Sequence, residues 1–234
     1  MRPFLQTEKR SLFMYCFLKT MRYFRKGVLE MKIMLTGFEP FLNFEHNPTE
    51  KIIRALHHTT RQNVTIEGVV LPVKFEGARE HLKEQLAAIQ PDAIVSLGLA
   101  AGRNNVTPER IALNIQQSSR PDNDGHVATG QAIDRHGEAS LFSTLPIDAM
   151  VEALVKEGYP ASISNTAGTY VCNAVMYEGL QYADKHKLFS GFIHIPADFE
   201  LAIAHGNLPS WNSTDLLAAV TVCLDVLIDK MIKE

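Results

Sequence analysis

Short apolar runs alternate with segments of helical periodicity along the chain from Met31 onward. A short apolar run is typical of a buried strand, whereas apolar residues three and four apart predict an amphipathic helix. Strands are expected at 32–37, 64–73, 93–99, 110–116, 161–166 and 191–196. Helices are expected at 47–58, 77–89, 148–157, 172–187 and 214–233. This alternation predicts an α/β protein with a mixed, mostly parallel sheet covered by helices on both faces.

Size and charge narrow the class of protein. The chain has 234 residues, of which 46% are hydrophobic, enough for one domain with a sizeable core. Its formal net charge is -3, which argues against a partner such as nucleic acid or a membrane surface. No run of about 18 apolar residues is present, so no membrane span is expected.

Residues 1–30 differ in composition from the rest. They hold seven Lys or Arg and two Glu, a net charge of +5, although the whole chain carries -3. The first clear strand pattern begins just after Met31. We therefore expect residues 1–30 to be an extension, either disordered or due to a misassigned start, and 31–234 to be a single catalytic domain. A short amphipathic surface anchor is a third reading of the extension.

The three cysteines are too few and too scattered for a disulfide framework, and none belongs to a metal-binding pattern. A reducing cytoplasm is the simplest interpretation. The short apolar segment at 11–18 has no small-residue cleavage site after it, which disfavours a secretory signal. Gly98 and Gly102 are too poor a glycine pattern for a phosphate-binding loop.

Cys172 follows a Gly-containing turn at the expected start of a helix. The free N–H groups and the dipole at a helix start stabilise an anion, and the thiolate is the nucleophilic form of cysteine. His194, near the end of an expected strand, is a candidate base for this thiol. The alternatives are a small buried apolar residue for Cys172 and a core histidine for His194.

Glu109 lies between a Gly-containing loop and an expected strand, where a carboxylate can orient an imidazole. Its alternative is a surface charge paired with Arg110 or Arg103. Phe38 and Phe41 flank Pro40 directly after the first strand. Core packing is the usual role of phenylalanine, but a loop at this position is an exposed place for two of them. A flat, mostly apolar ligand would explain the pair.

Taken together, these segments carry a family resemblance. The chain contains, in order, the motifs Gly-Phe-Glu-Pro-Phe at 37–41, Ala-Gly-Arg at 101–103, Thr-Pro-Glu-Arg-Ile-Ala-Leu-Asn at 107–114, Pro-Asp-Asn at 121–123, Thr-Ala-Gly-Thr-Tyr-Val-Cys-Asn at 166–173 and Phe-Ile-His-Ile-Pro at 192–196. Over about residues 31–234 the sequence resembles pyroglutamyl peptidase I, or pyrrolidone-carboxylate peptidase, a cysteine peptidase family.

The resemblance implies a catalytic triad of Cys172, His194 and Glu109. It also implies release of an amino-terminal 5-oxoproline (pyroglutamate) from peptide substrates, without metal or cofactor. The fold would be a three-layer α/β/α sandwich of the phosphorylase/hydrolase type, and such enzymes are commonly cytoplasmic homotetramers. Backbone N–H groups near Cys172 could serve as an oxyanion hole. Phe38 and Phe41 become the candidates for holding the uncharged lactam ring.

The sequence departs from the family pattern near the expected pocket. Leu99 stands where members usually have Gln, Ser119 where they have Arg with Arg120 adjacent, and Ala174 where many have His. Leu42 and Asn43 replace a usual Gly-Gly. The triad is intact, but the pocket and the rate can differ. Two other functions therefore stay open: a catalytically impaired protein that binds 5-oxoprolyl peptides, and a nucleoside phosphorylase-like transferase on the same fold.

Overall fold

The computed structural model describes residues 30–233, so the predictions for the extension at 1–30 fall outside the described residues, except at Glu30. A six-stranded sheet forms the centre, in the order β2-β3-β1-β4-β10-β5. Its strands are β1 (Met31–Phe38), β2 (Thr60–Arg61), β3 (Val64–Leu71), β4 (Ala93–Leu99), β5 (Thr107–Pro108) and β10 (Phe189–Ile195). Strands β1, β4 and β10 run parallel, while β2 is antiparallel to β3 and β5 to β10.

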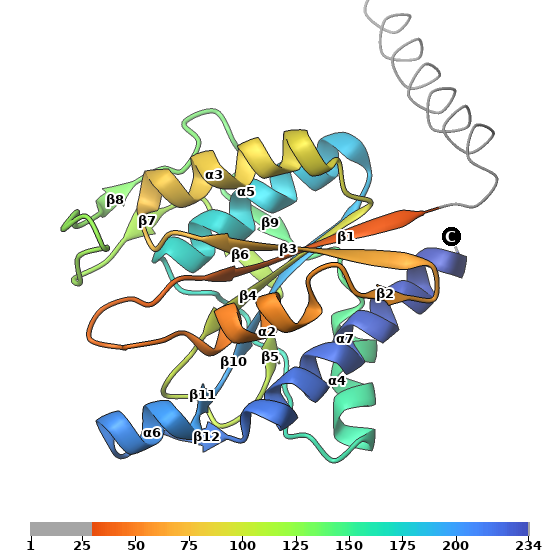
Figure 1. Cartoon of the computed structure of the whole chain (residues 1–234). Coiled ribbons are helices and arrows are strands. Elements are labelled where there is room, and N and C mark those ends of the chain that lie inside the picture. The colour runs from red at the N-terminus through yellow and green to blue at the C-terminus, as the bar shows by residue number, and fades with distance from the viewer. Residues whose placement is uncertain (1–29, 234) are drawn as a thin grey trace, which may run out of the picture. The chain divides into compact units, whose positions relative to one another are not determined.

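Helices cover both faces of this sheet (Figure 1). They are α2 (Pro48–Leu56), α3 (Phe75–Ile89), α4 (Ile147–Lys156), α5 (Val171–His186), α6 (Phe199–His205) and α7 (Ser213–Lys233). Helices α3 and α5 pack together on one face, and α2, α4 and α7 lie on the other. Every residue of β4 is buried, as the continuous apolar run predicts for a strand covered on both sides. The three-layer α/β/α sandwich is confirmed.

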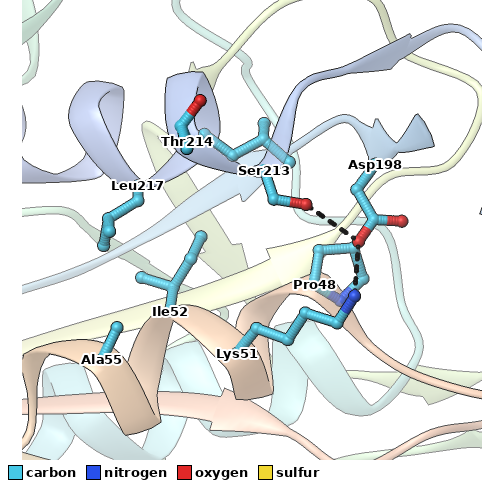
Figure 2. A pocket seen from close by; sticks show the side chains of 9 residues that line it. Pro48, Lys51, Ile52, Ala55, Asp198, Ser213, Thr214 and Leu217 are labelled. Carbon is cyan, nitrogen blue, oxygen red and sulfur yellow. Dashed lines mark hydrogen bonds and ion pairs between the residues drawn. The ribbon is translucent and has the colours of Figure 1, made fainter. Parts of the chain in front are cut away.

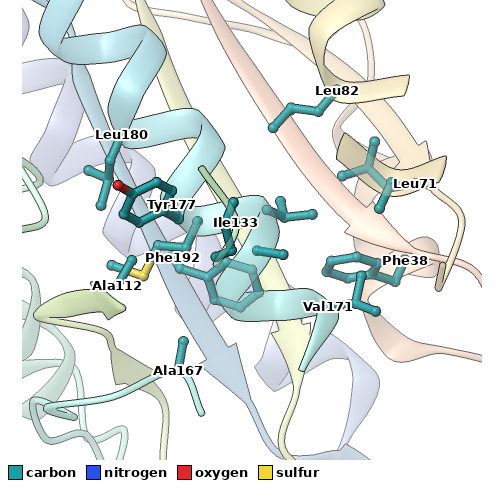
Figure 3. Packing of buried hydrophobic residues seen from close by; sticks show 14 of the residues in the cluster. Phe38, Leu71, Leu82, Ala112, Ile133, Ala167, Val171, Tyr177, Leu180 and Phe192 are labelled. Carbon is teal, nitrogen blue, oxygen red and sulfur yellow. The ribbon is translucent and has the colours of Figure 1, made fainter. Parts of the chain in front are cut away.

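The main core lies between the sheet and helices α3 and α5 (Figure 3). Its largest buried side chains include Phe192 of β10 and Tyr177 of α5, both with no exposed surface. The Tyr177 hydroxyl donates a 2.7 Å hydrogen bond to the Glu138 carbonyl, so this buried phenol is not left unpaired. The packing fixes the position of α5 along β4 and β10.

The expected strand at 161–166 does not form. This segment makes only isolated parallel bridges, between Val106 and Ala161 and between Glu109 and Ser164. The neighbouring strand β5 is two residues long, and its Pro108 has no N–H to continue a ladder. The segment therefore follows the sheet edge without becoming part of it.

Two further stretches differ from expectation because they pair with segments outside the main sheet. The strand expected at 110–116 is reduced to β6 (Ile111–Leu113), which pairs with β9 (Ser140–Phe142) outside the main sheet. The loop expected at 120–131 ends in β8 (Thr129–Gln131), paired with β7 (Gln116–Gln117). The remaining short elements are β11 (Ala197–Asp198) and β12 (Ser210–Trp211), which pair in parallel. These pairings join segments distant in sequence, so local periodicity does not reveal them.

Candidate active site

Strand pairing brings His194 and Glu109 together. His194 is the penultimate residue of β10, opposite Thr107 of β5. Glu109 follows β5 directly, and its backbone N–H donates to the Phe192 carbonyl at 2.8 Å. The side chains then meet, with 2.7 Å between His194 Nδ1 and Glu109 Oε1. An imidazole and a carboxylate 85 positions apart in sequence thus form one buried pair.

The Glu109 carboxylate is fully buried, with 0% of its surface exposed. Burial by itself would raise its pKa. The hydrogen bond and charge of His194, with help from Ser164 and Arg103, outweigh burial and hold the pKa of Glu109 below its usual range. An ionised carboxylate only accepts hydrogen bonds, so His194 Nδ1 carries a proton and donates a hydrogen bond to Oε1. Nε2 is therefore the nitrogen that can take up a proton from another group.

Cys172 is the second residue of α5, which packs against β4 and β10. The residue is half-buried. Burial, followed by the negative charge of Glu109, raises the pKa of the Cys172 thiol to about 12. A hydrogen bond with its own backbone amide and the charge of Arg103 offset this only in part. Burial and the charge of Glu109 therefore both oppose ionisation of the thiol at this helix start, where its position alone favours an anion.

The start of α5 is fixed by Asn173, which has no exposed surface. Its Oδ1 accepts from the Leu113 N–H at 2.9 Å, and its Nδ2 donates to the carbonyls of Leu113 and Ile115 at 2.8 and 3.0 Å. Tyr170 is the N-cap residue, and its side chain makes no hydrogen bond to the backbone N–H groups of the first turn. The first amides of a helix have no partner within it, so those beside Cys172 can face a ligand.

The loop after β1 holds the two phenylalanines differently. Phe38 is only 3% exposed, and its ring lies 6.3 Å from that of Phe192 in the core shown in Figure 3. Phe41 is half-buried and makes an edge contact with Phe44, at 5.6 Å between ring centroids. The expectation that both rings lie in an exposed loop was wrong for Phe38, since it is the last residue of β1 and points into the core.

A second loop is tied to this region by side chains that carry no role in the sequence analysis. Asp122 accepts hydrogen bonds from the N–H groups of Phe75, Asp124 and His126. Burial opposes its ionisation, but these three backbone donors outweigh it and lower the pKa of Asp122. Asn123 donates to Glu39 Oε1 at 2.8 Å and to the Pro40 carbonyl at 3.0 Å. The Pro-Asp-Asn motif is the signal that could have indicated this anchor.

Arg103 is expected from the sequence only as a surface partner of Glu109. Its Nη1 lies 2.7 Å from Glu109 Oε1, but this carboxylate is buried and is the one that holds His194. Arg110, the other candidate partner, bonds Asn165 instead. Arg103 therefore lies beside Glu109 and His194, and the Ala-Gly-Arg motif at 101–103 is the sequence signal that could have indicated it.

One cavity and two side-chain clusters of the described residues lie apart from Cys172, His194 and Glu109. A cavity of about 190 Å³ lies between α2 and the start of α7, with Lys51 and Asp198 at one end (Figure 2). Two groups of His and carboxylate side chains have the spacing of metal ligands within residues 30–233: His57, His58 and Glu67, and His46, Asp198 and Glu200. In the second group, Lys51 Nζ forms ion pairs with Asp198 Oδ2 at 3.2 Å and with Glu200 Oε2 at 2.6 Å.

Gly98 of β4 lies opposite His194 in the parallel register and leaves room for it. A Cβ at this position would come within 2.9 Å of His194 Cδ2 and 2.6 Å of the Phe192 ring. We expect Gly98→Ala to displace the imidazole, lowering kcat by about tenfold or more, since catalysis depends on sub-ångström placement. Steady-state kinetics test this, with Gly102→Ala as the control because a Cβ there meets nothing within 4 Å. Equal kcat values for the two variants would contradict the prediction.

A thiol, an imidazole and a buried carboxylate at the carboxyl edge of this sheet are the groups of a cysteine-type hydrolase. Residues 31–230 match the family model described as pyroglutamyl peptidase, and the chain belongs to that family. A pyrrolidone-carboxylate peptidase of Oceanobacillus iheyensis is 48% identical over 198 residues, covering 84% of this chain and 98% of the relative. One of Lysinibacillus sphaericus is 50% identical over 195 residues, covering 83% and 95%.

The solved structures lead to the same family. The pyrrolidone carboxyl peptidase of Pyrococcus furiosus superposes with a TM-score of 0.83 at 38% identity, covering 86% of this chain and 100% of that one. A mutant of the same hyperthermophile enzyme gives the same values. The family resemblance expected from the motifs is thus confirmed, and the chain is a peptidase.

None of the helices within residues 30–233 has the length and apolar character that spanning a membrane requires.

Proposed function

We propose that this protein is a cysteine exopeptidase that releases an amino-terminal 5-oxoproline from peptides, with Cys172, His194 and Glu109 as its triad. The observation that carries the proposal is the buried His194–Glu109 pair, joined at 2.7 Å, in a chain of the pyroglutamyl peptidase family. The carboxylate fixes the imidazole tautomer, so Nε2 is available as the base for the thiol.

The reaction begins from a neutral thiol. His194 Nε2 accepts the thiol proton as Cys172 Sγ attacks the carbonyl carbon that joins the lactam to the next residue. The tetrahedral intermediate collapses when the imidazolium donates that proton to the leaving amine. Water, activated by the same imidazole, then attacks the thioester carbonyl and releases 5-oxoproline. No metal or cofactor takes part in these steps.

Charge on the carbonyl oxygen develops next to the start of α5. The backbone amides of Val171 and Cys172 have no acceptor within the helix and are the candidates for an oxyanion hole. Members of the family usually have an arginine where this chain has Ser119, and Arg120 is the adjacent residue. We propose that Arg120 supplies charge to this region. Because Ser119 replaces the usual arginine, we expect a lower kcat than in family members that keep it.

The lactam is uncharged, and the loop with Phe38 and Phe41 is its proposed wall. Phe41 is half-buried and offers a ring surface, whereas Phe38 supports that loop from within the core.

An amino-terminal Gln would bring an ammonium against this apolar surface, which is costly without a partner. We expect kcat/KM for amino-terminal Gln peptides to be at least about a hundredfold lower than for their 5-oxoprolyl counterparts. Paired peptides that differ only in ring closure measure this ratio, and comparable values would contradict the proposed pocket.

The function is tested with a chromogenic 5-oxoprolyl amide, with and without a thiol-blocking reagent. Thiol-sensitive release supports the exopeptidase. Binding of the peptide without release would favour the catalytically impaired alternative, and a requirement for phosphate would favour the phosphorylase-like transferase. Neither alternative is favoured by the family match at 31–230.

The cellular context is part of the same proposal. A cytoplasmic homotetramer acting on peptides, without nucleic acid or membrane partners, fits the family resemblance and the net charge of -3. The catalytic domain is proposed to be 31–234, since the family match starts at residue 31.

A further inference from the structure

We propose that Arg103 is a positioning residue of the active site, which holds Glu109 so that Glu109 can orient His194. The proposal rests on the triad assigned above and names a residue that acts through it. Arg103 lies in the loop after β4, and its Nη1 donates to Glu109 Oε1 at 2.7 Å and to Thr107 Oγ1 at 2.5 Å. The guanidinium therefore ties the carboxylate to the strand β5 that precedes it.

Glu109 depends on this contact because of how its two oxygens are used. Oε1 accepts from both Arg103 and His194, whereas Oε2 is buried and has no hydrogen-bond partner among the described residues. The Ser164 hydroxyl contributes to the low pKa of Glu109, but it donates to the Thr166 carbonyl at 3.2 Å. The two short hydrogen bonds that orient the carboxylate therefore both reach Oε1, one from Arg103 and one from His194. Without Arg103, the imidazole would be the remaining short contact on the carboxylate that orients it.

Charge supports the same role. The charged or titratable groups that act on Glu109 are His194 from β10 and Arg103 from the loop after β4, and Glu109 in turn acts on Cys172 from α5. Among these groups only Arg103 carries a permanent positive charge. It contributes to lowering the pKa of Glu109 and that of the Cys172 thiol. The Arg103 side chain is 33% exposed, so solvent reduces these effects.

Arg103→Met is the primary variant. We expect kcat to fall about 10- to 100-fold with KM changed less than about twofold, since the substrate is not contacted and only the geometry of the base is lost. Loss of one cause that lowers the pKa of Glu109 lets this carboxyl protonate at higher pH. The acid limb of kcat/KM should therefore move to higher pH. Arg103→Lys, which keeps the charge, should recover most of both effects.

Arg110→Met is the matched control, because it removes the same charge from the next residue after Glu109, and Arg110 bonds Asn165 rather than the carboxylate. It should leave kcat and the acid limb near those of the unmodified protein. If Arg103→Met does not fold, as its melting temperature reports, Arg103→Gln replaces it, since the amide can keep a bond to Thr107 but has no charge. An unshifted acid limb together with unchanged kcat in the folded variant would overturn the proposal.

A second measurement does not depend on the substrate. The rate at which iodoacetamide alkylates Cys172, followed by peptide mass spectrometry over a range of alkaline pH, reports how readily this thiol ionises. It should fall in Arg103→Met and stay unchanged in Arg110→Met. If the unmodified protein does not release 5-oxoproline but alkylation still falls, the proposed function is wrong and the coupling of Arg103 to the site stands. If the unmodified protein is active and Arg103→Met is alkylated at the same rate, the role of Arg103 is refuted while the proposed function stands.

Discussion

Replacement of Cys172 by serine is expected to lower 5-oxoprolyl amidase activity by at least about four orders of magnitude while leaving the fold intact. The change exchanges one atom at the start of α5, where the thiol is half-buried. A hydroxyl is a much weaker acid than a thiol, so the imidazole of His194 generates the serine alkoxide far less readily than the thiolate. Chromogenic assay and circular dichroism of the purified variant measure the two effects.

Cys223→Ser is the control for this experiment. Cys223 is fully buried in α7, away from the triad elements, and burial raises the pKa of its thiol to about 12. We expect this variant to lose some stability, because a hydroxyl replaces an apolar thiol in the core, but to keep kcat within about twofold. Substantial activity in Cys172→Ser, or its loss in a folded Cys223→Ser, would refute the assignment of the nucleophile.

The second large effect is expected for Glu109→Gln, which should lower kcat by about three orders of magnitude. Arg103 requires an acceptor at Oε1, so the amide oxygen should remain there and the geometry should be kept. What is lost is the negative charge that stabilises the imidazolium formed during attack. The amide nitrogen would take the place of Oε2, which has no hydrogen-bond partner within residues 30–233, so some loss of stability is also expected.

Thiol reactivity should move in the opposite direction to turnover in this variant. The charge of Glu109 is one cause of the raised pKa of Cys172, so its removal should let iodoacetamide alkylate Cys172 faster at mildly alkaline pH. Glu178→Gln is the matched control, since it removes a largely buried carboxylate on α5 that pairs with Arg79 and Lys83. Alkylation and kcat should both be near normal there. A Glu109→Gln protein with more than about a tenth of the normal kcat would argue against the triad.

The sequence predicted most of the regular framework because periodicity is a local property. The helix expected at 172–187 is observed as α5 (Val171–His186), and the strand expected at 93–99 is β4 at those bounds. It failed at 161–166, where an apolar and polar alternation was present but the adjacent β5 was too short to pair with it. Strand formation requires a partner, and the partner is not encoded in the segment itself.

The candidate site divides in a similar way. Local setting made Cys172, His194 and Glu109 candidates with structural alternatives, and the family resemblance of the motifs joined them into a triad. The surroundings of these residues were not predictable. Phe38 follows an apolar strand but is buried against Phe192 from β10, 154 positions later. Arg103 was a local charge pair in the sequence and became a partner of a buried carboxylate in the fold.

By itself, the sequence determined the alternation of strands and helices, the family, and which three side chains to propose for catalysis. Only the tertiary structure decided that His194 and Glu109 touch, that burial and the charge of Glu109 raise the pKa of the Cys172 thiol, and that Arg103 contacts the Glu109 carboxylate. The reason is physical. Propensity and periodicity act over a few neighbouring residues, whereas burial and the charges that set a pKa depend on groups from β5, β10 and α5 that meet only when the chain is folded.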